Sequence, residues 1–150
     1  ANELGLPLVS FIDTPGAELS ANAEEGAIAG EIARCISMMS TMKVPTVSVL
    51  LGQGCGGGAL ALLPADVVVA TENSWLSPLP PEGASAIVHG DVDHAAEMAE
   101  RQKVSAIDMF ENGSVHQLVA EPDDDDPESF GRAVAAEVAT RLREQTSIPG

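Results

Sequence analysis

Aromatic and basic residues are both scarce in this 150-residue chain. It contains no tyrosine, aromatic residues make up 3% of it, and 7 Lys and Arg stand against 23 Asp and Glu, for a formal net charge of −16. So few aromatic rings leave little for nucleic acid bases to stack on, and a strongly negative protein repels the phosphate backbone. We therefore expect no nucleic acid partner.

Cysteine and long apolar runs are also lacking. Only Cys35 and Cys55 are present, too few for a disulfide framework or a four-ligand zinc site. No apolar run reaches eighteen residues, and residues 1–8 lack the basic segment and apolar stretch of a secretion signal. We expect a cytoplasmic protein with no metal and no membrane partner.

Short apolar runs alternate with segments in which apolar residues recur every three or four positions, the patterns of buried strands and amphipathic helices. We predict strands at 8–12, 47–51, 67–70 and 115–120. We predict helices at 24–42, from about 57 to 63, at 82–88, at about 92–103, from 105 to Gly113, and at about 127–144. Buried strands separated by helices favour a largely parallel sheet in one α/β domain over residues 1–150.

A glycine-rich stretch, residues 52–58, separates the second predicted strand from the next helix and contains five glycines. Because glycine weakens regular structure, such density indicates that the backbone approaches another group closely. Amides at a helix start near Gly57 are unpaired and lie at the positive end of the helix dipole, so they suit an oxygen that carries negative charge. Tight packing of helix against strand is the structural alternative.

Two nucleotide-binding patterns fail at this stretch. A phosphate-binding P-loop requires Lys and then Ser or Thr after its last glycine, whereas Ala59 and Leu60 follow here. The dinucleotide fingerprint requires an acidic residue at the end of a following strand, and the predicted strand 67–70 ends in Ala70. An oxyanion hole needs only backbone amides, and it fits the stretch better.

Residues 49–62, followed by Ala65 and Asp66, resemble the signature of the crotonase superfamily. Within that superfamily, residues 11–17, 24–26 and 77–85 resemble the carboxyltransferase alpha subunit of acetyl-CoA carboxylase. The motifs occur in the same order, from about residue 7 to 122. The resemblance implies a crotonase-like ββα spiral and a chain that is a fragment or one half of a larger carboxyltransferase.

The implied activity is transfer of a carboxyl group from carboxybiotin to acetyl-CoA or another short acyl-CoA. The implied partners are a biotin carboxyl carrier domain, the acyl-CoA, a complementary carboxyltransferase half and further copies in an oligomer. Crotonase-like hydratases carry an acidic residue where this chain has Leu60, which disfavours a hydratase. Two alternatives remain: a malonyl-CoA-type decarboxylase subunit and a noncatalytic crotonase-like partner domain.

The resemblance also assigns site residues. The catalytic groups it implies are backbone amides that hold the biotin ureido oxygen, those of Gly57, Gly58 and Ala59. The substrate-binding positions it implies line the facing side of the pocket and the biotin-side loop: Gly16, Ala17, Gly56, Glu82 and Gly83.

Other reactive side chains have simpler interpretations. Asp13 follows a strand, and we interpret it as stabilising a turn. Cys55 near a helix start is interpreted as a packed residue and not as an activated thiol. Glu82 suits either the biotin-side loop or the capping of free helix amides. The three histidines have no ligand spacing and are expected at the surface or hydrogen-bonded: His89, His94 and His116.

Overall fold

A computed structural model describes residues 1–16, 27–122 and 126–146. Its strands are β1 (Leu8–Thr14), β2 (Thr46–Cys55), β3 (Val67–Thr71), β4 (Trp75–Ser77) and β5 (Gln117–Val119). Its helices are η1 (Asn2–Leu4), α2 (Ile28–Ser40), α3 (Gly56–Leu62), α4 (Pro81–His89), α5 (Ala95–Gln102), α6 (Ala106–Glu111) and α7 (Pro127–Thr146).

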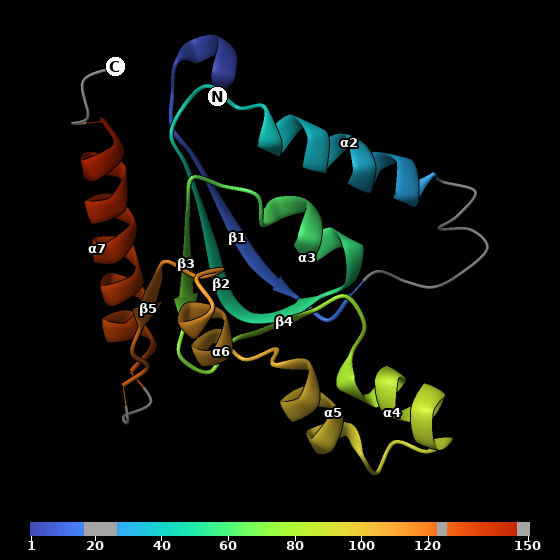
Figure 1. Ribbon diagram of the computed structural model, residues 1–150. Helices are drawn as coiled ribbons and strands as arrows, with labels where there is room; N and C mark the ends of the chain where they lie inside the picture. The colour runs from blue at the N-terminus through green and yellow to red at the C-terminus, as the bar shows by residue number, and fades with distance from the viewer. Residues whose placement is uncertain (17–26, 123–125, 147–150) are drawn as a thin grey trace.

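The strands form one parallel sheet in the order β1-β2-β3-β5, and β4 pairs with the far end of β2. Helix α7 lies on one face of this sheet, while α2 and α3 lie on the other (Figure 1). Helices α4 and α5 extend from the end of the sheet at which β4 lies (Figure 1). The parallel α/β arrangement predicted from the sequence is confirmed.

The core has two parts because successive residues of a strand point to opposite faces of a sheet. On one face, Val47 and Val49 of β2 pack with Val134 and Val138 of α7. On the other face, Leu50 joins a cluster that includes residues of α3 and α6. Strand β2 is therefore the centre of the molecule, and α3 follows directly from its end.

Strand β1 pairs only with β2, so it forms an edge of the described sheet. On the α7 side, Phe11 of β1 is 56% exposed. An apolar groove of about 540 Å³ lies there between β1, β2 and α7. Within the described part of the chain, α7 therefore covers this face of the sheet only in part.

The structure corrects several predicted boundaries. Strand β2 was predicted to end at Leu51, but it continues to Cys55 because its last residues pair with β4, a strand that the sequence did not reveal. Strand β5 is shorter than the predicted 115–120, and α5 begins at Ala95 and not at Val92. The predicted start of the helix 24–42 lies partly outside the described residues; its described part, α2, ends at Ser40. No helix in the described ranges is long and apolar enough to span a membrane.

Candidate active site

The glycine-rich stretch is a strand end followed by a helix, and not a loop. Gly54 lies in β2 beside β4, where a Cβ would come within 2.7 Å of Leu76 Cδ1 and 2.9 Å of the Trp75 carbonyl oxygen. Only glycine allows β4 to approach this closely. For Gly54, the alternative of tight packing is therefore correct.

Helix α3 begins at Gly56 with Cys55 as its N-cap, and no side chain caps it. In such a helix the first three residues, Gly56, Gly57 and Gly58, have amides without an intrahelical acceptor. At the fourth helical position the amide normally donates to the N-cap carbonyl, and the residue at this position of α3, Ala59, is fully buried. Because the helix begins at Gly56 and not near Gly57, its free amides are those of residues 56–58, one position before the predicted set of 57–59. They lie at the positive end of the helix dipole.

The three glycines of this first turn lack side chains for different reasons. Gly56 has a φ of +74°, a conformation that other residues avoid. At Gly57 a Cβ would lie 2.8 Å from Ile32 Cδ1 of α2, so the close packing of α2 requires glycine there. At Gly58 a Cβ would meet nothing within 4 Å. The side of α3 at Gly58 is therefore open, and no described neighbour explains the glycine.

Gly16 faces this helix start from the end of β1. Its φ is +114°, and a Cβ on it would lie 3.4 Å from Cys55 Sγ. A Cβ on Gly56 would in turn lie 3.8 Å from Gly16 Cα, so the two backbones lie close together. The Gly16 amide donates to Thr14 Oγ1 at 3.2 Å. Gly16 thus lies beside the start of α3, whereas Ala17 is outside the described residues.

The opposite end of α3 is held by side chains from three elements. Ser48 Oγ of β2 donates to the Leu62 carbonyl at 2.5 Å, and Ser10 Oγ of β1 donates to the same oxygen at 3.1 Å. Cys35 Sγ of α2 donates to the Ala61 carbonyl at 3.6 Å. These bonds satisfy carbonyls that a helix end leaves without partners. They anchor the C-terminal end of this short helix, whose first residue, Gly56, lies beside Gly16.

Cys55 and Glu82 lie close enough to interact across the site. Burial raises the pKa of the Cys55 thiol, and the negative charge of Glu82 raises this pKa further. Cys55 is 2% exposed, so it is a packed, protonated residue and not an activated thiol, as predicted. Glu82 lies in the first turn of α4, and at the next position a Cβ on Gly83 would lie 3.2 Å from Leu79 Cδ1. Gly83 is therefore explained by the packing of Leu79.

A cavity of about 870 Å³ lies between β4, α4, α5 and α6. Its lining includes the indole of Trp75 and five carboxylates, those of Glu72, Glu82, Glu97, Glu100 and Asp108. Glu82 lines the cavity and its charge also raises the pKa of the Cys55 thiol, but no described residue of α3 lines the cavity. Such a lining repels phosphate groups and tolerates neutral ligands.

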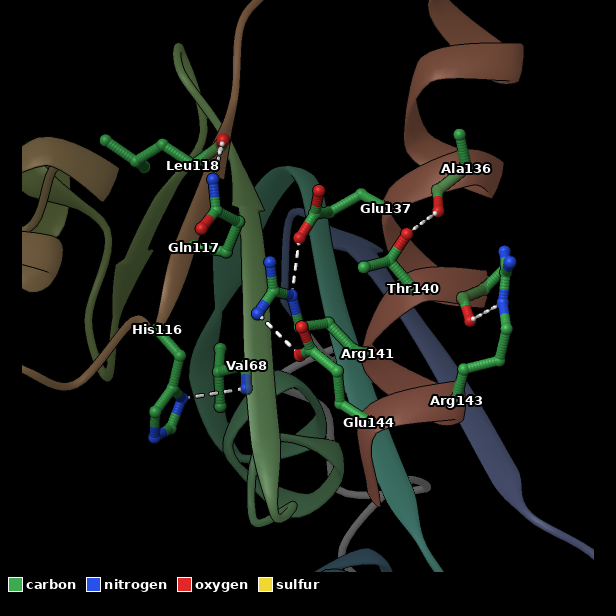
Figure 2. Close-up of polar contacts among 11 residues, drawn as sticks. Val68, His116, Gln117, Leu118, Ala136, Glu137, Thr140, Arg141, Arg143 and Glu144 are labelled. Carbon is green, nitrogen blue, oxygen red and sulfur yellow. Dashed lines mark hydrogen bonds and ion pairs between the residues drawn. The ribbon is translucent and has the colours of Figure 1, made fainter. Parts of the chain in front are cut away.

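The histidines are hydrogen-bonded or paired, and they lie away from α3. Figure 2 shows the His116 ring directed at Val68, whose amide donates to His116 Nδ1 at 2.9 Å. His94 Nδ1 lies 2.9 Å from Asp91 Oδ1, and its ring stacks on His89 at 4.2 Å, a proximity that the sequence did not predict. In the described ranges no group of three or more His, Cys, Asp or Glu side chains is arranged to hold a metal ion.

Among the described residues, Asp13 stabilises the neighbouring strand and not its own turn. Its Oδ1 accepts the amide of Gln53, forty positions along the chain, at 3.0 Å. A Cβ on Gly52 would lie 2.8 Å from the same oxygen. The prediction of a structural role for Asp13 is right in kind, but the segment that it stabilises is the neighbouring strand.

The family model for acetyl co-enzyme A carboxylase carboxyltransferase-like proteins matches residues 1–149. The chain belongs to this family. It is 49% identical to a probable biotin-dependent acyl-coenzyme A carboxylase beta3 subunit of Mycobacterium tuberculosis, over 99% of this chain and 30% of the relative. It is 42% identical to an acetyl-coenzyme A carboxylase carboxyl transferase subunit alpha of Thermus thermophilus, over 82% of this chain and 39% of the relative. The chain therefore spans about a third of the length of these relatives.

Solved structures of carboxyltransferases share the fold, which is crotonase-like as the resemblance implied. The transcarboxylase 12S structure with methylmalonyl-coenzyme A bound matches with a TM-score of 0.78 and 21% identity, over 97% of this chain and 28% of that chain. A Pseudomonas malonate decarboxylase hetero-tetramer in complex with coenzyme A matches with a TM-score of 0.77 and 15% identity, over 95% of this chain and 58% of that chain. At these identities the likeness concerns the fold alone.

Proposed function

We propose that this chain supplies an oxyanion-stabilising half-site to a biotin-dependent acyl-CoA carboxyltransferase. The observation that carries the proposal is the start of α3, which no side chain caps, together with the space beside Gly58, which no described side chain fills. Glycine lowers the stability of a helix, so its presence there needs an explanation. Where no side chain packs against the glycine, close approach of a ligand to the backbone provides that explanation.

The amides of Gly57 and Gly58 are the donors that we assign to the biotin ureido oxygen. Gly56 and Gly16 place backbone, and not side chains, beside this position, which leaves room for a planar ring. The Ala59 amide belongs to the set that the resemblance implies, but the helix start at Gly56 engages it in the first turn, so we assign it a supporting role. Gly83 enters the proposal only as the neighbour of Glu82, and Ala17, which lies outside the described residues, enters it through the resemblance alone.

The chemistry that biotin supplies when bound is delivery of the carboxyl group that is transferred. The chain's contribution is electrostatic: the two amides strengthen their hydrogen bonds as negative charge develops on the oxygen that they hold. Removal of one donor of this kind typically slows a reaction by about 10² to 10³-fold. Leu60 and the buried, protonated Cys55 offer no base near these amides, and this mechanism does not need one.

The acidic cavity beside Glu82 supports a division of labour between two half-sites. Its five carboxylates repel the several negative charges of the CoA phosphates more strongly than the single carboxylate of carboxybiotin, whose ureido oxygen is neutral. We therefore place the acyl-CoA and the stabiliser of its enolate on a complementary carboxyltransferase half. The biotin arrives on a carrier domain, and the halves assemble into an oligomer.

Substitution of Gly58 by Ala tests the assigned amides in the intact assembly that contains this chain. The new methyl group meets no described atom, so the protein folds and gains up to about 0.5–1 kcal/mol of helix stability. The methyl group blocks the open side of α3, so we expect biotin-dependent decarboxylation of malonyl-CoA, the reverse reaction, to slow by about 100-fold.

Gly131→Ala is the matched control. Gly131 is an exposed glycine of α7, and a Cβ there also meets nothing within 4 Å. We expect a similar gain in melting temperature with unchanged activity. If Gly58→Ala retains the wild-type rate, the open side of α3 is not where the reacting oxygen binds.

A further inference from the structure

Strand β2 contains an irregularity immediately before α3. Ile12 pairs with Leu50 and Thr14 pairs with Gly54, so β1 advances by two residues while β2 advances by four. The extra residues of β2 bulge outward opposite Asp13. Such bulges bend a strand and redirect the residues that come after it.

The bulge is closed by the side chain of Asp13. Oδ1 accepts the Gln53 amide at 3.0 Å, and it occupies the space that a side chain on Gly52 would fill. The three atoms nearest to a Cβ on Gly52 all belong to Asp13. The absence of a side chain at Gly52 therefore leaves the space that the Asp13 carboxylate occupies.

The redirected end of β2 determines where the free amides lie. Up to Leu50, β2 pairs with β3, whereas from Gln53 to Cys55 it pairs with β4. Helix α3 starts at the next residue. On the β1 side, the chain reaches Gly16 three residues after Asp13, and Gly16 packs against Cys55. One hydrogen bond thus joins both segments that form the site.

We propose that Asp13 is a positioning residue, which acts as a hydrogen-bond acceptor for Gln53 and thereby sets the direction of α3 and its amides. The inference rests on the proposed function, because it concerns the same amides. Asp13 is not placed as a base or as a charge that contacts the substrate. Its negative charge is therefore dispensable, whereas its acceptor oxygen is not.

Asp13→Asn and Asp13→Ala separate these two properties in the intact assembly. Asn retains an oxygen at the position of Oδ1 and removes the charge, so we expect kcat within about three-fold of wild type. Ala removes the acceptor, and because a misplacement of about 1 Å can cost about 10²-fold, we expect kcat to fall by about 100-fold. The KM for malonyl-CoA should stay within about three-fold, since the acyl-CoA binds to the other half.

Asp66→Ala is the control for a purely structural loss. Asp66 Oδ2 accepts the Thr46 amide at 2.8 Å, so it makes the same kind of bond at the opposite end of β2. We expect both Ala variants to lower the melting temperature, and only Asp13→Ala to lower kcat.

Gly52→Ala provides a second test that does not alter Asp13 itself. Its Cβ would lie 2.8 Å from Oδ1, so we expect it to displace the carboxylate and to lower kcat as Asp13→Ala does. In the double variant, Asp13→Ala with Gly52→Ala, the space that the carboxylate occupied is vacant. The second substitution should therefore not lower kcat any further. A double variant whose loss is the product of the two single losses contradicts the proposed complementarity of Gly52 and Asp13.

The outcomes distinguish this inference from the proposed function. If Asp13→Asn is as inactive as Asp13→Ala, the charge matters and the positioning role is wrong. If Asp13→Ala is fully active while Gly58→Ala is inactive, the positioning role is again wrong, but the assigned amides stand. If both variants are fully active, the proposed function fails as well.

Discussion

Gly57 and Gly58 are neighbours in the sequence, yet they differ in what surrounds them. Ile32 of α2 covers Gly57, and nothing described covers Gly58. The sequence predicted that the backbone of this stretch approaches another group closely. It could not show at which glycine that group is a protein side chain and at which glycine it is a ligand. That distinction depends on α2, which lies more than twenty residues earlier in the chain.

Cys55 permits a chemical test of the packing at the site. Because burial and then Glu82 raise its thiol pKa from an ordinary value of 9.0, the thiolate forms only at higher pH than usual. Cys35 is half-buried, whereas Cys55 is buried. We expect iodoacetamide at pH 8 to modify Cys35 before Cys55 in the folded protein, as measured by mass spectrometry of peptides. Equal rates for the two cysteines in the folded protein, and not only in urea, would contradict this packing.

Helix α3 depends on its neighbours because it is short. Isolated helices of its length do not persist in water, so tertiary contacts hold it. Ser48 is fully buried and donates to the Leu62 carbonyl, and it also pairs with Ser10 at 2.9 Å. Removal of one buried hydrogen-bond partner typically costs about 1–3 kcal/mol.

Ser48→Ala is therefore expected to lower the free energy of unfolding by about 1–2 kcal/mol, because Ser10 still bonds to the same carbonyl. Urea denaturation measures the change. Ser40→Ala is the control, since Ser40 Oγ bonds to the Ile36 carbonyl on the exposed surface of α2, and it should change stability by less than about 0.5 kcal/mol. A loss from Ser48→Ala no larger than that of the control would mean that these serines do not anchor α3.

Elements with a clear apolar period could be predicted from the sequence, and those defined by pairing could not. The apolar runs around residues 8–12, 47–51 and 67–70 all became strands. The helix predicted to start at 105 is also present as α6, and Ser105 Oγ caps it by accepting the Asp108 amide at 3.1 Å. In contrast, β4 is three residues long, and the end of β2 is rich in glycine. Both are strands because of their pairing, with each other and, at Gly54, also with β1, and no local pattern reveals this pairing.

Over the whole molecule the net charge is negative, whereas the proposed binding site lies at the positive end of a helix dipole. The chain carries a net charge of −16, and five carboxylates line the cavity beside α4. The first turn of α3 nevertheless presents amides at the positive end of a dipole. The ureido oxygen is well suited to this combination because it is neutral on arrival and gains negative charge only during the reaction, although carboxybiotin as a whole carries one carboxylate. A ligand that carries several negative charges, such as CoA, is better bound elsewhere in the assembly.

Biotin dependence is the property that separates carboxyl transfer from direct decarboxylation on the same fold. The decisive measurement is the decarboxylation of malonyl-CoA and methylmalonyl-CoA by the intact assembly that contains this chain, with and without free biotin. We predict turnover of at least one of the two substrates that requires biotin. Turnover that is equally fast without biotin would contradict carboxyl transfer and indicate a decarboxylase. The absence of turnover under both conditions would also contradict carboxyl transfer, and it would indicate a noncatalytic partner domain.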